Sequence, residues 1–257
     1  MLKPNFNRLM GCENSNPSYL VCMKYSGGLS QKGSTNMNTP ASKHYSEEVV
    51  NAFHCLYYHS LGWDNNWYLG YQIKQCPFDI QVYQELICRV LPNFIVQTGV
   101  AGGGSVLFFA TLLDLLGMEP TSVVIGIDLH LSTAAKALKH PRIRLVEGNS
   151  TAPETIRSVE SLIPNGRGLV SLDSDHSARH VANELRLYCE FVGVGSYLVV
   201  EDTNINGHPV LPGFGPGPFE AVADFLRADQ RFVRDDEVWK RNLFSFHQHG
   251  WLKRVEC

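Results

Sequence analysis

The sequence predicts a doubly wound α/β fold with a mostly parallel, seven-stranded sheet and an N-terminal helical extension. Three observations predict it. From residue 93 onward, short apolar runs alternate with stretches of helical periodicity, which is typical of β-α-β units. The apolar runs indicate strands that helices cover on both faces. Hydrophobic residues make up 44% of the 257 residues and charged residues only 18%, so the chain can bury a full core.

The expected elements follow from these patterns in chain order. Strands are expected at residues 94–96, 123–127, 143–146, 169–172, 197–200, near 232 and at 244–246. Helices are expected at 105–116, 132–139, 152–163, 178–192 and 219–226. Two earlier helices are predicted, one capped by Ser46 and ending near Ser60, and one that follows Pro77 and ends near Val90.

The chain divides by composition into three segments. Residues 1–45 are rich in Asn, Ser and Gly and are expected to form a flexible arm. Residues 46–92 are expected to form a helical segment on the side where a small molecule would bind, and residues 93–257 the α/β domain itself. The aromatic stretch 63–71 either packs the first helices together or shapes the pocket of a substrate.

Charge and cysteine content narrow the class of protein. A net charge of −3 and a pI near 6.4 give no electrostatic reason to bind nucleic acid or an anionic membrane, so a small molecule is the expected partner. The chain shows no signal-peptide pattern and no apolar run of membrane-spanning length, so a cytoplasmic location is expected. The seven cysteines are odd in number and form no CxxC pair, which favours reduced thiols.

A glycine-rich turn follows the first predicted strand. Ligands of open α/β sheets bind outside the carboxyl ends of the strands. The turn offers five candidate cofactor-binding residues: Gln97, Thr98, Gly99, Gly103 and Ser105. Its glycines allow the backbone to approach a ligand and to turn sharply into a helix. Their spacing is not that of the GxGxxG dinucleotide fingerprint, and the turn alone is also compatible with a tight connection.

The second and third strands also end in polar residues. Asp128 can accept hydrogen bonds from the two hydroxyls of a ribose, or it can cap the next helix. Asn149 and Ser150 can contact an adenine edge or cap the helix that follows. Together with the glycine turn, Asp128 indicates a ligand of the adenosine type.

Acidic residues follow the fourth and fifth strands. Asp173 and Asp175 follow one strand, and Glu201 and Asp202 follow the next. Carboxylates that repel one another need a cation between them, and oxygen ligands favour Mg²⁺. His176, with a pKa near neutrality, is a candidate general base. The alternative is helix capping with a structural histidine.

A loop dense in Gly and Pro follows the fifth strand. Such residues fix an ordered but irregular path. His208 projects from this loop, and it is a second candidate for the base or for substrate contact. Its alternative role is to stabilise the loop.

At these residues the sequence resembles the cephalosporin hydroxylase/rhamnosyl O-methyltransferase family over about residues 60–255. The matching words are Val96-Gln97-Thr98-Gly99, Gly126-Ile127-Asp128, Leu172-Asp173-Ser174-Asp175-His176, Val199 to Val210, Gly213 to Pro218, and Gly250 to Arg254. The resemblance implies a class I methyltransferase fold, S-adenosylmethionine (SAM) as methyl donor, Mg²⁺, and a sugar or natural product as acceptor. It also implies a homo-oligomer.

The resemblance also implies roles for residues. The Gly99 loop would face the methionine part of SAM, and Asp128 would hold the ribose. Glu201, Asp202 and one of Asp173 or Asp175 would hold the metal, with Asp173 also bordering the cofactor. The family has glutamate where this chain has Gln97, whose amide lacks the attraction of a carboxylate for the cofactor's ammonium group.

These observations predict a SAM- and Mg²⁺-dependent O-methyltransferase that acts on a hydroxyl of a small molecule. One alternative is a non-catalytic accessory protein that binds SAM or a partner enzyme, which the change at Gln97 leaves open. An NAD-dependent oxidoreductase is disfavoured by the missing GxGxxG spacing. N-methylation requires no metal, so the acidic residues argue against it.

Overall fold

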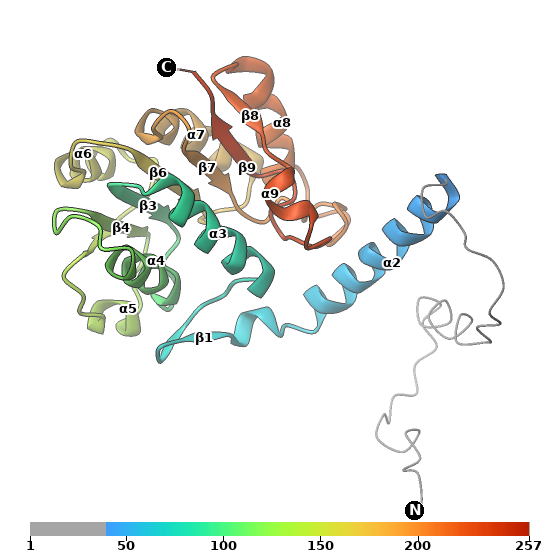
Figure 1. Cartoon of the computed structure of the whole chain (residues 1–257), viewed down its shortest axis with the longest axis horizontal. Helices are drawn as coiled ribbons and strands as arrows, with labels where there is room; N and C mark the ends of the chain where they lie inside the picture. Colours follow the sequence, from blue (N-terminus) through green and yellow to red (C-terminus); the bar gives the residue numbers. More distant parts are fainter. Residues whose placement is uncertain (1–39, 257) are drawn as a thin grey trace, which may run out of the picture. The chain divides into compact units, whose positions relative to one another are not determined.

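The protein is represented by a computed structural model that describes residues 40–256, with side chains from residue 47 onward. The arm predicted for residues 1–45 lies almost entirely outside the described residues. The main feature is a seven-stranded sheet in the order β5-β4-β3-β6-β7-β9-β8 (Figure 1). The predicted fold class is confirmed.

Five strands of this sheet run parallel: β3 (Phe94–Thr98), β4 (Val123–Asp128), β5 (Ile143–Glu147), β6 (Gly168–Leu172) and β7 (Tyr197–Val200). The last two are β8 (Phe232–Arg234) and β9 (Trp251–Arg254), and β9 is antiparallel to both of its neighbours. The strand order reverses between β3 and β6, which is where ligands bind in doubly wound sheets.

Helices cover both faces of the sheet, as the apolar strands predict. One apolar layer joins one face to α3 (Pro77–Val90), α4 (Gly104–Leu115), α5 (Thr133–Ala137) and the short α9 (Glu237–Lys240). The other face packs against α6 (Pro153–Leu162), α7 (Ala178–Tyr188) and α8 (Pro218–Ala228) (Figure 1). Neighbouring strand residues alternate between the layers, as Ile95 and Val96 do. The helix predicted to reach residue 192 changes after α7 into the 3-10 helix η3 (Cys189–Phe191).

The segment before α3 holds more structure than the sequence pattern predicts. It comprises α2 (Pro40–His59), the 3-10 helix η2 (Trp63–Asn65) and a small hairpin of β1 (Trp67–Tyr68) and β2 (Tyr71–Gln72). The prediction that Ser46 caps α2 is wrong, because the helix begins at Pro40 and Ser46 lies inside it. Proline suits a first helical turn, where its missing N–H would have no partner.

The strand predicted at residues 244–246 is also wrong. Ser245 and Phe246 donate hydrogen bonds to the buried carboxylate of Asp79, at 2.5 and 2.8 Å. Phe244 and Phe246 pack against Tyr57, Tyr58 and Trp63. The apolar pattern at 244–246 therefore reflects an aromatic cluster between α2, η2 and this loop. For Trp63, the first residue of the aromatic stretch, this favours the predicted role of packing helices together. The last strand is instead β9, seven residues further along the chain.

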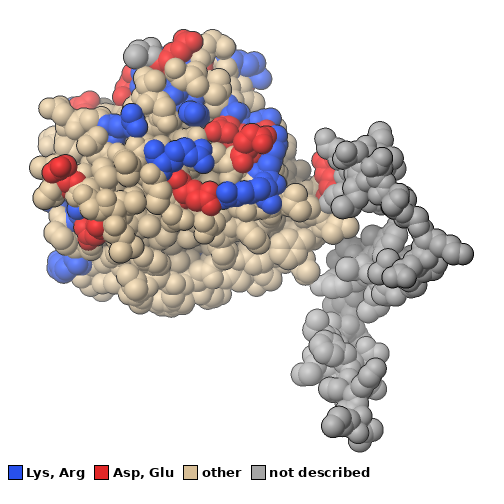
Figure 2. Space-filling model, in the orientation of Figure 1, with Lys and Arg blue, Asp and Glu red and all other residues tan. Residues whose placement is uncertain are grey.

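The state of the cysteines, the surface charge and the length of the helices can be compared with the sequence predictions. The cysteines with described side chains, Cys55, Cys76, Cys88 and Cys189, are free thiols. Figure 2 shows acidic and basic side chains interspersed on this face of the molecule, with no continuous basic patch there. Within the described range, none of the helices has the length and apolar character needed to span a bilayer.

Candidate active site

The loops after β3, β6 and β7 meet at one edge of the sheet. The Asp173 N–H donates to the carbonyl oxygen of Thr98 at 3.0 Å, and the Glu201 N–H donates to that of Leu172 at 2.9 Å. Gly99 adopts φ +79°, and a Cβ on it would lie 1.8 Å from the carbonyl oxygen of Asp173. Glycine is therefore required here, because both the left-handed backbone and the close approach exclude a side chain.

Asp128, at the end of β4, organises the glycine-rich turn. Its Oδ2 accepts hydrogen bonds from the N–H groups of Val100 and Ala101 at 2.9 and 3.0 Å. Its Oδ1 accepts one from the N–H of His130 at 3.0 Å. A carboxylate has about four acceptor positions, so one remains for a ligand hydroxyl. The structure thus places Asp128 beside the turn that the sequence associates with it.

A cleft of about 670 Å³ runs along this edge of the sheet. It includes eight of the predicted site residues: Gly99, Asp128, Asn149, Ser150, Asp173, Asp175, His176 and Asp202. Trp63 and Asp64, from the aromatic stretch that was expected to pack helices or to shape a substrate pocket, also line it. The other lining residues had no predicted role: Lys74, Ala101, Ile127, Leu129, Gly148, Ser174 and His180. The adenosine-type residues and the acidic residues therefore share one cleft.

Three of the acidic-edge residues form a compact group. Asp173, His176 and Asp202 each offer a ligand atom, and these atoms lie within 4.8 Å of one another. The His176 Nε2 lies 3.4 Å from Asp173 Oδ1, and its Nδ1 lies 3.6 Å from Asp202 Oδ2. The side chains are 20–28% exposed, so they face the cleft from a half-buried position.

The electrostatics of this group are those of crowded negative charge. Burial and repulsion from Glu201 raise the pKa of Asp173 well above its ordinary value, and the hydrogen bond from His176 opposes this. Burial lowers the pKa of His176, but Asp173 and Asp202 outweigh it and raise that pKa to about 9. Asp173 and Asp202 therefore favour a positive charge at His176, a role that a divalent cation fills equally well.

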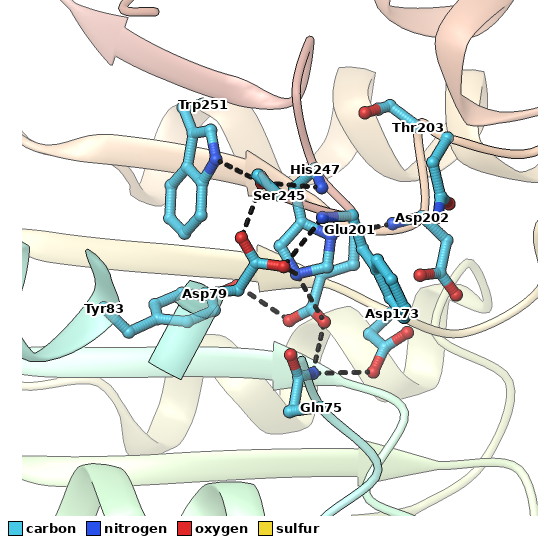
Figure 3. Close-up of polar contacts among 12 residues, drawn as sticks. Gln75, Asp79, Tyr83, Asp173, Glu201, Asp202, Thr203, Ser245, His247 and Trp251 are labelled. Carbon is cyan, nitrogen blue, oxygen red and sulfur yellow. Dashed lines mark hydrogen bonds and ion pairs between the residues drawn. The ribbon is translucent and has the colours of Figure 1, made fainter. Parts of the chain in front are cut away.

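Glu201 lies behind this group, in a buried polar network that Figure 3 shows. Its Oε1 accepts hydrogen bonds from the hydroxyls of Tyr83 and Ser171, at 2.7 and 2.5 Å. Its Oε2 accepts one from the Gln75 amide, which also donates to Asp173 Oδ2 at 3.4 Å. Glu201 is 2% exposed, and it lies outside the compact group that faces the cleft.

The other two candidates, Asp175 and His208, lie outside the compact group of Asp173, His176 and Asp202. Asp175 lines the cleft, but its Oδ1 accepts the N–H of Ser177 at 2.8 Å and so shapes the start of α7. Hydrogen bonds from Ser177 lower the pKa of Asp175. The His208 Nε2 lies 3.3 Å from Glu220 Oε1, and the ring stacks on Phe219. His208 does not line the cleft, and these contacts are the loop-stabilising kind.

The remaining cofactor candidates occupy the strand ends and helix starts. Gln97 is 1% exposed, and its Oε1 has no hydrogen-bond partner among the described residues. Thr98 accepts the Asp173 N–H through its Oγ1 at 3.2 Å. Gly103 precedes α4 at φ +89°, and Ser105 is buried in the first turn of that helix.

The two residues after β5 differ in their contacts. Asn149 Oδ1 accepts the Thr151 N–H at 2.9 Å, which forms a turn before α6; the helix itself has Ala152 as its N-cap and no side-chain cap, so the predicted capping role is wrong. Ser150 Oγ lies 3.0 Å from His180 Nε2. Both Asn149 and Ser150 line the cleft.

Some residues that line the cleft were not among the predicted site residues. Lys74 pairs with Asp64 at 2.8 Å beside the cleft, and neither stands in a recognisable motif. His180 lies one turn into α7 and faces Glu184 at 3.4 Å. Its position four residues before Glu184 on an amphipathic helix was the one available hint. Trp63 belongs to the aromatic stretch, and its ring NH donates to the Tyr58 carbonyl at 2.9 Å.

Comparisons with known proteins agree with this picture. The family model described as Rhamnosyl O-methyltransferase/CmcI matches residues 61–255. A rhamnosyl O-methyltransferase of Mycobacterium bovis (strain BCG / Pasteur 1173P2) is 35% identical over 209 residues, covering 80% of this chain and 82% of that protein. One from Mycobacterium leprae (strain TN) is 34% identical over 213 residues, covering 81% and 92%.

Solved structures show the same fold. The structure of apo CmcI has a TM-score of 0.58 at 22% identity, covering 75% of this chain and 77% of that one. CmcI with Mg and SAM has a TM-score of 0.57 at 22% identity, covering 74% and 77%. At this identity the likeness concerns the fold alone.

Together, the sheet topology, the cleft and the relatives define the class: an O-methyltransferase. The chain belongs to the rhamnosyl O-methyltransferase/CmcI family. The family resemblance and the enzyme class predicted from the sequence are confirmed.

Proposed function

We propose that this enzyme transfers the methyl group of SAM to a hydroxyl oxygen of a sugar or natural product, with a divalent cation held at the acidic edge. The observation that carries the proposal is that Asp173, His176 and Asp202 converge in the cleft that Gly99 and Asp128 also line. The rhamnosyl acceptor in the relatives' names makes a sugar hydroxyl the first candidate. The homo-oligomer stays a prediction.

The cofactor half of the proposal depends on the β3, β4 and β5 loops. The Gly99 turn would admit the methionine part, Asp128 would accept a ribose hydroxyl at its one remaining acceptor position, and Asn149 and Ser150 would border the adenine. Gln97 does not itself line the cleft, and its buried Oε1 lacks a donor among the described residues, so its contact with the cofactor stays a prediction.

The cation half depends on whether the donors suit the ion. Two carboxylates with a histidine between them fit a hard divalent cation, and Glu201 behind them adds negative charge. Asp173 and Asp202 would hold Mg²⁺, which when bound would favour the anionic form of an acceptor hydroxyl. Asp175, whose carboxylate shapes the start of α7, is the weaker candidate of the pair that follows β6.

We assign the base to His176 rather than His208, because only His176 lines the cleft. Its raised pKa comes from Asp173 and Asp202. If a cation neutralised these two carboxylates, a ring nitrogen of His176 would be free to take the proton of the substrate hydroxyl. Holding the acceptor oxygen in line with the sulfonium methyl supplies much of the remaining acceleration.

A chelator experiment tests the proposal. We expect turnover with a rhamnose-containing acceptor to need Mg²⁺, to stop after EDTA treatment, and to return on adding Mg²⁺ in excess. Methyl transfer is followed as S-adenosylhomocysteine release, with calorimetry of SAM binding alongside. Full turnover in EDTA would refute the cation role. SAM binding without turnover on any hydroxyl acceptor would favour the accessory-protein alternative instead.

A second prediction concerns Asp128. Replacing it with alanine removes a ribose acceptor and the anchor of the Val100 and Ala101 amides. Hydrogen bonds to a charged group contribute about 1.5–3 kcal/mol, so we expect SAM affinity to fall by about 10- to 100-fold. Isothermal titration calorimetry measures this. An unchanged SAM dissociation constant would exclude Asp128 from the cofactor site.

A further inference from the structure

Two adjacent carboxylates, Glu201 and Asp202, point into different surroundings. The Glu201 carboxylate is 1% exposed and lies in the buried network, whereas that of Asp202 is 20% exposed and faces His176 in the cleft. The backbone at Asp202 produces this separation, because it adopts the left-handed region at φ +52°. Aspartate adopts this region more readily than most L residues, but it is still a minor conformation, so contacts from elsewhere help to hold it.

One of those contacts comes from the buried side chain of His247. The Nδ1 of His247 accepts the main-chain N–H of Asp202 at 2.9 Å, and the side chain of His247 is 2% exposed (Figure 3). A nitrogen that accepts a hydrogen bond carries no proton, so the proton of the neutral ring is on Nε2. The Nε2 faces Glu201 Oε2 at 3.4 Å and Asp79 Oδ2 at 3.7 Å. The Nε2 makes no hydrogen bond among the described residues, but the negative charge of the two carboxylates favours a proton there, which is the tautomer that leaves Nδ1 free to accept.

The segment that carries His247 is itself fixed against β7 and α3. The Val200 N–H donates to the Gly250 carbonyl at 2.9 Å, and the Asn204 N–H donates to the Phe246 carbonyl at 3.1 Å. Asp79 in α3 accepts the N–H of Phe246 at 2.8 Å. His247 therefore reaches Asp202 from a rigid frame that spans three regions of the chain.

We propose that His247 is a positioning residue of the cation site: it holds the Asp202 main chain in the left-handed conformation that turns the Asp202 carboxylate toward Asp173 and His176. The inference rests on the proposed function, since it gives that site its orientation. His247 acts through Asp202 and is neither a ligand nor a base. Residues that orient metal ligands in this way typically change metal affinity by about 10- to 100-fold when replaced.

Two amide substitutions separate positioning from mere packing. In His247→Asn, the side-chain oxygen is as many bonds from Cα as Nδ1 is, so it can accept the Asp202 N–H. In His247→Gln, the amide falls at the position of Nε2, so it keeps a polar neighbour for Glu201 and loses the acceptor for Asp202. Both variants are made in the full chain, and both place a polar amide in the same buried site.

The first readout is Mn²⁺ affinity, measured by electron paramagnetic resonance. We expect the dissociation constant to rise at least about tenfold in His247→Gln and to stay within about threefold of wild type in His247→Asn. SAM affinity should stay within about threefold in both, because the cofactor loops lie on other strands. Equal Mn²⁺ affinity in His247→Gln and wild type would overturn the inference, as would equal losses in the two variants.

The second readout needs no cation. Amide hydrogen exchange at Asp202, followed by NMR, should be at least about tenfold faster in His247→Gln than in wild type or His247→Asn, because the Asp202 N–H loses its acceptor. Unchanged exchange in His247→Gln would refute the inference. If the wild-type protein bound no Mn²⁺, the cation part of the proposed function would fail, and this exchange experiment would still decide the role of His247.

Discussion

Replacing Asp202 with asparagine is expected to lower Mg²⁺-dependent turnover at least about a hundredfold. Asparagine tolerates the left-handed backbone that Asp202 adopts at φ +52°, so the substitution removes charge and leaves the main chain in place. A metal ion stabilises a developing oxyanion by several kcal/mol, and each 1.4 kcal/mol is about a factor of ten in rate. Steady-state kinetics over a range of Mg²⁺ concentrations measures the loss.

The companion variant is Asp175→Asn, the same chemical change in the same cleft. Its amide oxygen can still accept the Ser177 N–H, so the start of α7 is retained. Because Asp175 lies outside the compact group of Asp173, His176 and Asp202, we expect its turnover to stay within about threefold of wild type. If Asp175→Asn lost as much turnover as Asp202→Asn, the cation site would have to include Asp175, and the assignment to Asp173 and Asp202 would be wrong.

The fold was predictable because its signal is local. Each parallel strand is a short apolar run, and each is followed by a helix of clear periodicity, so the strands from β3 to β7 were found within a few residues. The errors arose where a distant partner decides the structure. Residues 244–246 were predicted to form a strand, but the Phe246 N–H and the Ser245 hydroxyl both donate to Asp79, which lies far away in sequence. The strands β1 and β2 have two residues each, which is too short for an alternation of apolar and polar residues to be recognised in the sequence.

The candidate site was predictable to the extent that strand ends define it. Gly99, Asp128, Asp173 and Asp202 each lie at the end of a strand or within two residues after it, so topology alone brings them to one cleft. The direction of the Glu201 side chain, toward the buried hydroxyls of Tyr83 and Ser171, could not be predicted from the sequence. It depends on the left-handed backbone at Asp202.

The residues beyond the strand ends gave no comparable signal. Lys74, His180 and His247 come from a loop, a helix and the chain's end, and only three-dimensional packing brings them to the site. No spacing along the chain connects His247 with Asp202, because the segment between them includes α8, β8 and α9.

Gly99→Ala is the substitution for which we expect the largest loss of stability. A Cβ at this position would lie 1.8 Å from the Asp173 carbonyl oxygen, which is backbone and cannot rotate away. The left-handed conformation at φ +79° costs alanine about 1–2 kcal/mol, and overpacking typically adds about 1–3 kcal/mol. We therefore expect the free energy of unfolding to fall by about 2–5 kcal/mol, measured by urea denaturation, and SAM affinity to fall at least about tenfold.

Gly195→Ala provides the matched control, because Gly195 adopts φ +81° with open space where its Cβ would stand. It should show only the backbone cost of about 1–2 kcal/mol and unchanged SAM affinity. The difference between the two variants then isolates the contact between the β3 and β6 loops, the one that brings the glycine turn against Asp173. If both variants lost equal stability and both bound SAM normally, that close approach would not be what joins the cofactor loop to the acidic edge.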